Sequence, residues 1–214
     1  MADESARARE RATLIEGAQR LGCALTAASA EALLTLLDEL VRWNRAYNLT
    51  AIEDRAELIT HHLLDSLSVH ADLSGTRIAD VGTGAGFPGL PLALVEPQRA
   101  FTLIDASQKK LRFVAHAARV LELANATTLH ARVERLAPET PFDTVIARAF
   151  APLPELLAQV GGLTGPATRV LAMKGRLHAA ELAGVTDPWR VVEQRPLEVP
   201  GLGEVRHLVV LGRT

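Results

Sequence analysis

The sequence predicts an α/β fold with a mostly parallel sheet, an antiparallel hairpin at the C-terminal end and a helical extension at the N-terminal end. Three observations support this. Apolar residues recur at helical spacing in roughly the first seventy residues, short apolar runs alternate with helical stretches from Arg77 onward, and a short turn separates the last two strand-like runs. We place the boundary near Gly75, which gives an extension over 1–74 and a sheet domain over 75–214.

The extension contains one clear amphipathic helix, expected to begin near Thr26. Its apolar face is made of Leu33, Leu34, Leu37, Leu40 and Val41. A tight segment over 43–50 follows, and a second helix is expected over Ala56–Val69. Trp43 and Tyr47, four residues apart, are interpreted as packing residues rather than as a platform for bases. Four N-terminal arginines are interpreted as a solvated helix face, with RNA backbone contact as the alternative: Arg7, Arg9, Arg11 and Arg20.

From Arg77 strands and helices alternate. The expected strands are Arg77–Val81, Ala100–Asp105, Ala126–Ala131, Phe142–Ala147 and Thr168–Met173, and the helices between them are Leu90–Val95, Gln108–Leu121 and Leu153–Val160. Such alternation forms βαβ units and therefore a parallel sheet. The last two runs, Trp189–Val199 and Val205–Leu211, are joined by so short a turn that they must pair antiparallel. A parallel sheet closed by such a hairpin is typical of Rossmann-like methyltransferases.

A glycine-rich loop follows the first expected strand, with the sequence Asp80-Val81-Gly82-Thr83-Gly84-Ala85-Gly86-Phe87-Pro88-Gly89. Two motifs overlap in it. Gly84, Gly86 and Gly89 fit the G-x-G-x-x-G fingerprint of dinucleotide sites. Asp80, Gly82, Gly84 and Gly86 fit the acidic-x-G-x-G-x-G loop that wraps S-adenosylmethionine. Glycines let the backbone turn sharply and approach a ligand closely, so a turn without a ligand is the weaker interpretation.

Both motifs require an acid after the second strand to bind ribose hydroxyls, and Asp105 stands there. We favour S-adenosyl-L-methionine because Asp80 suits the loop's own amides or a ligand ammonium. In addition, Pro88 and Pro91 interrupt the place where a dinucleotide-binding helix would run. The chain after the sheet also leaves no room for a separate substrate domain. An NAD(P)-binding oxidoreductase remains the alternative class.

Composition limits the remaining classes. The formal net charge is −2, so attraction to nucleic acid must come from a local patch. Cys23 is the only cysteine, which excludes an intrachain disulfide and fits a reducing, cytoplasmic location. No apolar stretch is long enough to span a membrane, and the charged N-terminus does not resemble a signal peptide. His61, His62 and Asp65 lie on one helix and offer too few ligands for a metal, so we expect none.

Two cationic residues are candidates for the chemistry. Arg148 follows the fourth strand and Lys174 ends the fifth, at the sheet edge where α/β sites form, with solvated or salt-bridged side chains as the alternative. Methyl transfer from a sulfonium mainly needs alignment. The segment 146–152 lacks the Asn/Asp-Pro-Pro-aromatic loop of amine methyltransferases, and Cys23 is far in sequence from the sheet. A ring nitrogen such as guanine N7, from which no proton must be removed, is compatible with such a site.

At this point the chain resembles a known family over nearly its whole length. It is similar to the bacterial glucose-inhibited division protein B group, the small-subunit ribosomal RNA guanine-N7 methyltransferases. Six segments carry the resemblance: Trp43-Asn44-Arg45-Ala46-Tyr47-Asn48-Leu49-Thr50-Ala51-Ile52, His62-Leu63-Leu64-Asp65-Ser66-Leu67, the loop over 80–89, Arg132-Val133-Glu134, Arg148-Ala149-Phe150-Ala151 and Met173-Lys174-Gly175. One departure is His61, where the family commonly has arginine.

The resemblance implies methylation at N7 of one guanine in the decoding-region loop of 16S rRNA, with the RNA or the small ribosomal subunit as partner. It implies donor contacts at Gly82, Phe87, Asp105, Val133 and Glu134, and at Arg148. Arg148 and Lys174 are the candidate catalytic residues, and Asn48 and Lys174 are expected near the target base. We expect a monomer. Another RNA, a protein or a small molecule as acceptor, or a non-catalytic RNA-binding factor, are the alternatives.

Overall fold

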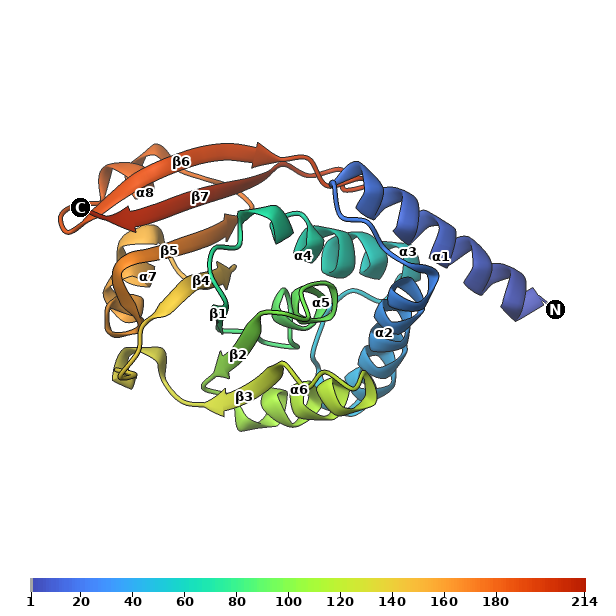
Figure 1. Cartoon of the computed structure of the whole chain (residues 1–214). Helices are drawn as coiled ribbons and strands as arrows, with labels where there is room; N and C mark the ends of the chain where they lie inside the picture. The colour runs from blue at the N-terminus through green and yellow to red at the C-terminus, as the bar shows by residue number, and fades with distance from the viewer. Residues whose placement is uncertain (1) are drawn as a thin grey trace.

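The computed structural model describes residues 2–214 and contains one seven-stranded sheet, in the order β3-β2-β1-β4-β5-β7-β6 (Figure 1). The strands are β1 (Arg77–Val81), β2 (Ala100–Asp105), β3 (Ala126–His130), β4 (Phe142–Arg148), β5 (Thr164–Lys174), β6 (Trp189–Leu197) and β7 (Arg206–Arg213). The first five pair in parallel, whereas β7 pairs antiparallel with both β5 and β6. The predicted fold class is confirmed.

The helices lie on both faces of the sheet (Figure 1). In chain order they are α1 (Ala2–Arg20), α2 (Ala27–Tyr47), α3 (Arg55–Leu58), η1 (Ile59–Leu64), α4 (Asp65–Leu67), η2 (His70–Asp72), α5 (Gly89–Val95), α6 (Gln108–Val120), η3 (Val133–Arg135), α7 (Leu153–Val160), η4 (Gly161–Leu163) and α8 (Ala179–Ala183). The predicted bounds of β1, β2 and α7 match those observed at both ends. The short helix α8 was not predicted.

Helix α2 shows how local sequence fixes an element. The Thr26 side chain accepts a hydrogen bond from the Ser29 amide at 3.0 Å, which caps the helix at its predicted start. Leu33, Leu34, Leu37 and Leu40 are buried as expected. Val41 is an exception, because 39% of its surface is exposed at the edge of the apolar face. The helix runs on to Tyr47, so the first half of the expected tight segment is helical.

The second expected helix is interrupted in its middle. Residues 59–64 form a π-helical segment, in which the Asp65 amide donates to the Thr60 carbonyl five residues back. π-helical turns inside helices are rare and occur often at functional sites. Hydrophobic periodicity does not distinguish a π turn from an α turn over so short a stretch, so this turn could not be predicted.

The N-terminal arginines do not all form a solvated face. Arg7 is paired with Glu31 at 2.7 Å and with Asp38 at 3.0 Å, and so ties α1 to α2. Arg55, at the start of α3, pairs with Glu10 at 3.1 Å and with Asp38 at 2.8 Å. The three helical segments therefore share one network of ion pairs.

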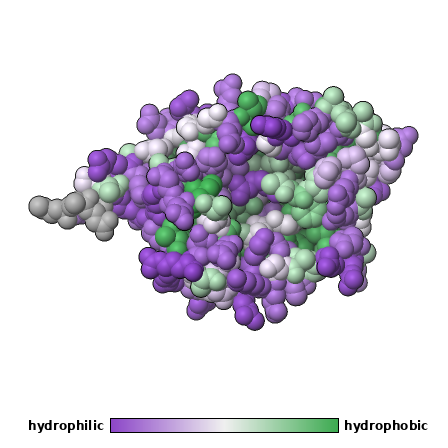
Figure 2. Space-filling model, turned by 180° about the vertical axis from the view of Figure 1, so that it is seen from behind, coloured by the Kyte–Doolittle hydropathy of each residue, from purple (hydrophilic) through white to green (hydrophobic). Residues whose placement is uncertain are grey.

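Two apolar clusters cover the two faces of the sheet. One contains Leu14 and Leu37 of the extension together with Ile78, Leu103 and Leu208 of the sheet, so helices and sheet share a core across the expected boundary near Gly75. The other packs α7 against alternate residues of β1 and β4, such as Ala79 and Val145. Hydrophilic side chains cover most of the face seen in Figure 2, with smaller hydrophobic areas between them.

Candidate active site

The glycine loop joins β1 to α5 at the carboxyl end of the sheet. Gly82, Gly84 and Gly86 have φ values of 67°, 58° and 86°, a region that side chains with a Cβ rarely adopt. A Cβ at Gly82 would overlap the Phe150 ring, whereas a Cβ at Gly84 would point into open space, with only the Gly82 carbonyl at 3.9 Å. The loop thus forms a cradle with room for a ligand above Gly84.

Asp80 is buried beneath this loop. Its Oδ2 accepts hydrogen bonds from the Thr83 hydroxyl at 2.6 Å and from the Gly89 amide at 2.9 Å. Of the two roles expected for Asp80, a bond to a loop amide is present, while contact with a ligand ammonium stays a prediction. Its Oδ1 is buried with no hydrogen-bond partner. Burial raises the pKa of Asp80 to about 6, although the two hydrogen bonds and the Arg148 charge act to lower it.

Asp105 also fixes the loop. Its Oδ2 accepts from the Gly84 amide at 2.9 Å and its Oδ1 from the Ser107 amide at 2.7 Å. Contact with ribose hydroxyls, expected from the motif, stays a prediction, and carboxylate oxygens keep further lone pairs for it. Val133 and Glu134 form the turn after β3, where Val133 is buried and Glu134 is exposed. Their predicted adenine contacts also remain untested.

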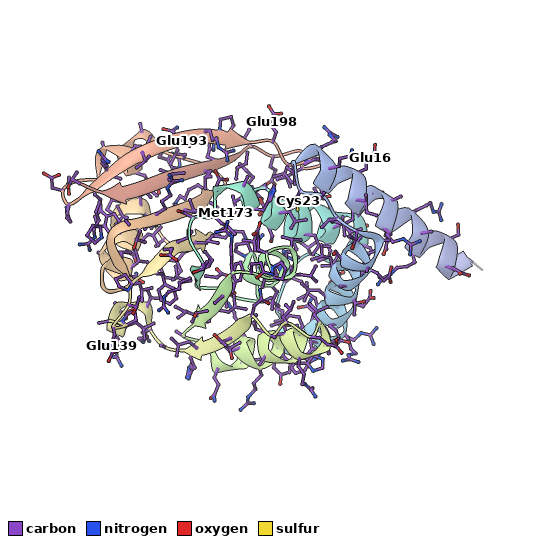
Figure 3. The ribbon with its side chains drawn as sticks, in the orientation of Figure 1. Glu16, Cys23, Glu139, Met173, Glu193 and Glu198 are labelled. Atoms are coloured by element: carbon purple, nitrogen blue, oxygen red, sulfur yellow. The ribbon has the colours of Figure 1, made fainter. Side chains whose placement is uncertain are left out.

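A pocket of about 340 Å³ lies beside the glycine loop. It is lined on one side by the loop, and on the others by the ends of β4 and β5, the start of β7 and the extension. Figure 3 places Met173, one of its lining residues, inside the molecule near the end of β5, while Glu16, Glu139 and Glu198 point outward. The pocket therefore stands at the sheet edge where the order reverses between β1 and β4.

Arg148 reaches this pocket from the end of β4. Its Nη1 donates to the His61 carbonyl at 2.8 Å and to Asp65 Oδ2 at 3.0 Å. The guanidinium also lies 5.8 Å from the centre of the Phe87 ring. Arg148 is thus ion-paired, as the alternative interpretation held, and also lines the pocket, as the functional interpretation required.

Lys174 lines the opposite side, at the end of β5. Its Nζ donates to the Ala151 carbonyl at 3.0 Å and pairs with Glu181 at 2.7 Å. That pair involves α8, the helix that the sequence did not reveal. The Lys174 contacts lower the pKa of Glu181, against a desolvation effect that raises it.

Three ionisable residues that line the pocket were not predicted as part of the site: Arg206, Asp65 and His62. Arg206, at the start of β7, brings a third positive charge into the lining. Asp65 contributes a carboxylate from α4, and His62 lies stacked on Phe87 with ring centres 4.7 Å apart. Burial, followed by the charges of Arg148 and His61, lowers the pKa of His62 to about 3, so this imidazole is neutral. In the sequence, His62 and Asp65 belong to one of the six family segments, and the only role considered for their side chains is metal binding.

Asn48 was expected close to the target base. It is the C-cap of α2, with φ of 50°, and its side chain is exposed, while the next residue, Leu49, lines the pocket. Asn44 builds this turn: its Oδ1 accepts from the Leu49 amide at 2.6 Å and from the Thr50 amide at 3.0 Å. A structural role of Asn44 therefore accounts for part of the 43–50 segment. The base contact of Asn48 remains a prediction.

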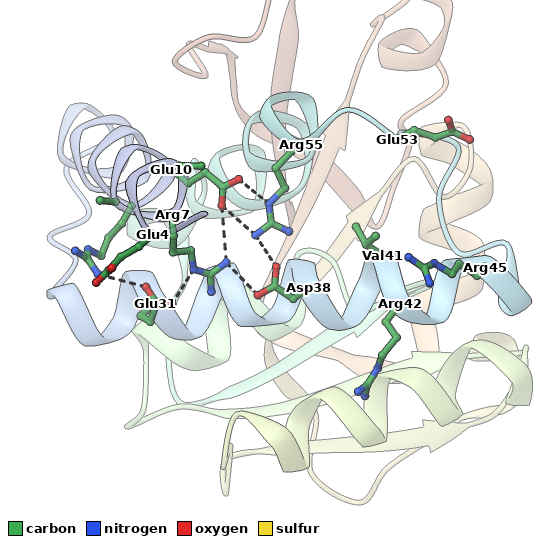
Figure 4. A pocket seen from close by; sticks show the side chains of 13 residues that line it. Glu4, Arg7, Glu10, Glu31, Asp38, Val41, Arg42, Arg45, Glu53 and Arg55 are labelled. Atoms are coloured by element: carbon green, nitrogen blue, oxygen red, sulfur yellow. Dashed lines mark hydrogen bonds and ion pairs between the residues drawn. The ribbon is translucent and has the colours of Figure 1, made fainter. Parts of the chain in front are cut away.

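A larger groove of about 1250 Å³ lies between α1 and α2 (Figure 4). Figure 4 shows that Arg7, Glu10, Asp38 and Arg55 in its wall are turned toward one another and pair internally. Their charges are balanced within the groove, which holds no glycine-loop residue. We therefore assign the donor site to the smaller pocket.

Other residues considered in the sequence lie outside the donor pocket. Trp43 packs against Tyr47 at 4.9 Å and against Phe113 at 5.8 Å, which confirms the packing interpretation. Lys109 and Lys110 are exposed at the start of α6, and Lys109 lies over the Tyr47 ring. Over residues 2–214, no group of three His, Cys, Asp or Glu side chains is placed to hold a metal. In the same range, no helix has the length and apolarity needed to cross a bilayer.

Solved structures share this architecture. A magnesium protoporphyrin IX methyltransferase from Synechocystis with bound S-adenosylmethionine has a TM-score of 0.59 and 19% identity, and the match covers 89% of this chain and 99% of that one. TrmN from Thermus thermophilus has a TM-score of 0.55 and 22% identity, over 73% and 53% of the two chains. The shared architecture is the fold of class I methyltransferases, and the glycine cradle lies at the carboxyl end of its sheet.

The family follows from sequence. The model of the family described as rRNA small subunit methyltransferase G matches residues 29–209. A ribosomal RNA small subunit methyltransferase G from Pseudomonas paraeruginosa is 45% identical over 94% of both chains. One from Aromatoleum aromaticum is 46% identical over 94% of this chain and 98% of its own. The chain belongs to the rRNA small subunit methyltransferase G family, as the resemblance had indicated.

Proposed function

We propose that the protein transfers a methyl group from S-adenosylmethionine to N7 of one guanine in the decoding-region loop of 16S rRNA. The observation that carries this proposal is the cationic pocket beside the glycine loop, in a chain of this family. Three positive side chains line the pocket, each paired with a carboxylate: Arg148 with Asp65, Lys174 with Glu181 and Arg206 with Glu204. Their remaining N–H groups are suited to contact the phosphates and base of an RNA at the donor site.

The chain's residues mainly bind and orient. When bound, S-adenosylmethionine supplies an already activated methyl group. Gly82 and Gly84 let the backbone approach it, with Asp80 and Asp105 holding the loop in shape. We assign ribose contact to Asp105 and contacts near the adenine to Val133 and Glu134. Phe87 and Arg148 complete the donor side.

The acceptor side fits a nucleophile that needs no base. Guanine N7 carries an in-plane lone pair, so no proton has to leave before transfer. Among the pocket residues, His62 is a weak proton acceptor because its pKa is lowered to about 3, and the Asp65 carboxylate is already paired with Arg148. We assign Lys174 and Asn48 to the positioning of the target base, and Arg148 to its alignment with the methyl group.

Transfer of labelled methyl to small ribosomal subunits that lack the modification tests this proposal, with the product mapped by mass spectrometry. The expected product is a single guanine methylated at N7. Arg148→Ala should lower kcat by roughly tenfold to a hundredfold, because alignment is lost. Arg190→Ala, an exposed arginine on β6, is the matched control and should leave kcat unchanged. Label on another atom, or an Arg148→Ala enzyme with full activity, would contradict the assignment.

A further inference from the structure

Asp65 is the carboxylate of the pocket wall and comes from α4 in the extension. Only 2% of its side chain is exposed. Its Oδ2 accepts from Arg148 Nη1 at 3.0 Å, and its Oδ1 lies 3.6 Å from Arg206 Nε without forming a hydrogen bond. One carboxylate thus stands between two guanidinium groups from different strands.

Among the described residues, each arginine has one other hydrogen-bonding or ion-pairing partner. For Arg148 it is the His61 carbonyl, at 2.8 Å. Both His61 and Asp65 belong to the π-helical stretch or its end, where the amide of Asp65 bonds to Thr60 rather than to His61. For Arg206 the other anchor is Glu204, 64% exposed, and an exposed ion pair holds a side chain weakly. Asp65 is therefore the buried group common to both arginines.

The charges in the pocket are a second reason to expect that Asp65 holds the two arginines in position. Arg148, Arg206 and Lys174 converge on one pocket and repel one another unless an anion lies among them. A buried carboxylate is itself costly unless paired, which two guanidinium groups achieve from opposite sides. The arrangement keeps both arginines directed at the pocket in the absence of RNA.

We propose that Asp65 is a positioning residue for methyl transfer, which holds the Arg148 and Arg206 guanidinium groups where the acceptor nucleotide enters. This rests on the proposed function in one respect, that the acceptor is RNA. Asp65 acts on turnover rather than on RNA affinity. Loss of its negative charge leaves the pocket more attractive to phosphate, while the arginines lose their fixed positions.

The test compares Asp65→Asn with wild type in three measurements: kcat for methyl transfer to small-subunit RNA, Kd for that RNA over a range of salt concentrations, and the unfolding midpoint. We expect kcat to fall roughly tenfold to a hundredfold. We expect RNA Kd to stay equal or to decrease, with a steeper salt dependence. Asp72→Asn is the matched control: Asp72 pairs with Arg195 at 2.7 Å outside the pocket, so the same change there should leave kcat alone.

Two further variants secure the result. Asp65→Glu keeps the charge but lengthens the side chain, so it should lower kcat without changing the salt dependence. Asp65→Asn in an Arg148→Ala background should lower kcat less than it does alone, because part of its effect passes through Arg148. An unchanged kcat in both Asp65 variants would overturn the proposal. Parallel losses of kcat, RNA affinity and unfolding midpoint would also overturn it, by showing a merely structural role.

The same measurements separate this proposal from the proposed function. The product is mapped in the wild-type enzyme. A methyl group on another RNA atom would refute N7 methylation only, and the ratio of the kcat values would still decide the role of Asp65. No methyl transfer to any RNA would refute both.

Discussion

Asp80→Asn isolates the cost of burying a charge under the donor loop. Asp80 has no exposed surface, and burial raises its pKa from 3.8 to about 6. The difference of about 2 pKa units corresponds to roughly 3 kcal/mol of destabilisation of the folded chain once the carboxyl is ionised. Asparagine keeps an acceptor for the Thr83 hydroxyl and the Gly89 amide but does not titrate.

The sign follows from proton binding. At pH values between 3.8 and about 6 the folded chain holds the Asp80 proton more often than the unfolded chain does. The contribution of Asp80 to the free energy of unfolding therefore falls as the pH rises through that window, and it is constant at higher pH. The linkage relation gives a loss of about 1.4 kcal/mol between about pH 5 and about pH 8 for wild type, and none from this position in the variant.

Urea unfolding of both proteins across this pH range measures the difference directly, because all other titrating groups cancel. The new amide NH2 replaces an oxygen that has no partner and adds a penalty of about 1–3 kcal/mol, but that penalty is the same at every pH. The decisive quantity is therefore the change with pH in the difference between the two free energies of unfolding. Parallel stability curves would refute the reasoning, because Asp80 would then titrate alike in the folded and unfolded chain.

Four other substitutions test the loop and the pocket separately. Gly82→Ala should lower the free energy of unfolding in urea by roughly 1–3 kcal/mol, because of its positive φ and its overlap with Phe150. Gly84→Ala should lower it by only about 1–2 kcal/mol, yet it should abolish donor binding in calorimetry. Equal donor affinity in Gly84→Ala and wild type would refute the cradle. Ala149→Gly should stabilise by roughly 0.5–1 kcal/mol in the same assay, since Ala149 has φ of 49°. The pKa of His62 is lowered from 6.5 to about 3, so stability should fall as the pH drops below 6.5, and His62→Gln should reduce that slope; an unchanged slope would contradict it.

The elements that could be predicted are those whose signal is local. The alternation of short apolar runs with helices predicted the first five strands, and two strand-like runs joined by a short turn predicted the last two. Thr26 marked the start of α2. The glycine loop was predictable because its conformation demands glycine at particular positions. β5 begins at Thr164, four residues before the predicted start at Thr168; this earlier start was not predicted because Gly165 and Pro166 are residue types typical of turns. In the fold they lie beside an irregularity in the pairing with β4.

The parts of the site that could not be predicted depend on contacts between residues that are far apart in the sequence. The sequence around Arg206 does not predict its contact with Asp65, because the two residues lie far apart in the chain. Glu181 and Lys174 pair through a short helix whose apolar pattern is too brief to detect. Arg148 was found only because its position after β4 is informative in any parallel sheet. Its partners, which decide how it is held, were not.

The place of β7 in the sheet bears on how this chain is made. β7 lies between β5 and β6, and Val210 on it shares an apolar cluster with Leu14 of α1. The apolar cluster that contains the start of the chain is therefore completed by a strand synthesised more than 180 residues after α1 ends. The donor pocket, which includes Arg206, is therefore complete only after nearly the whole chain has been synthesised.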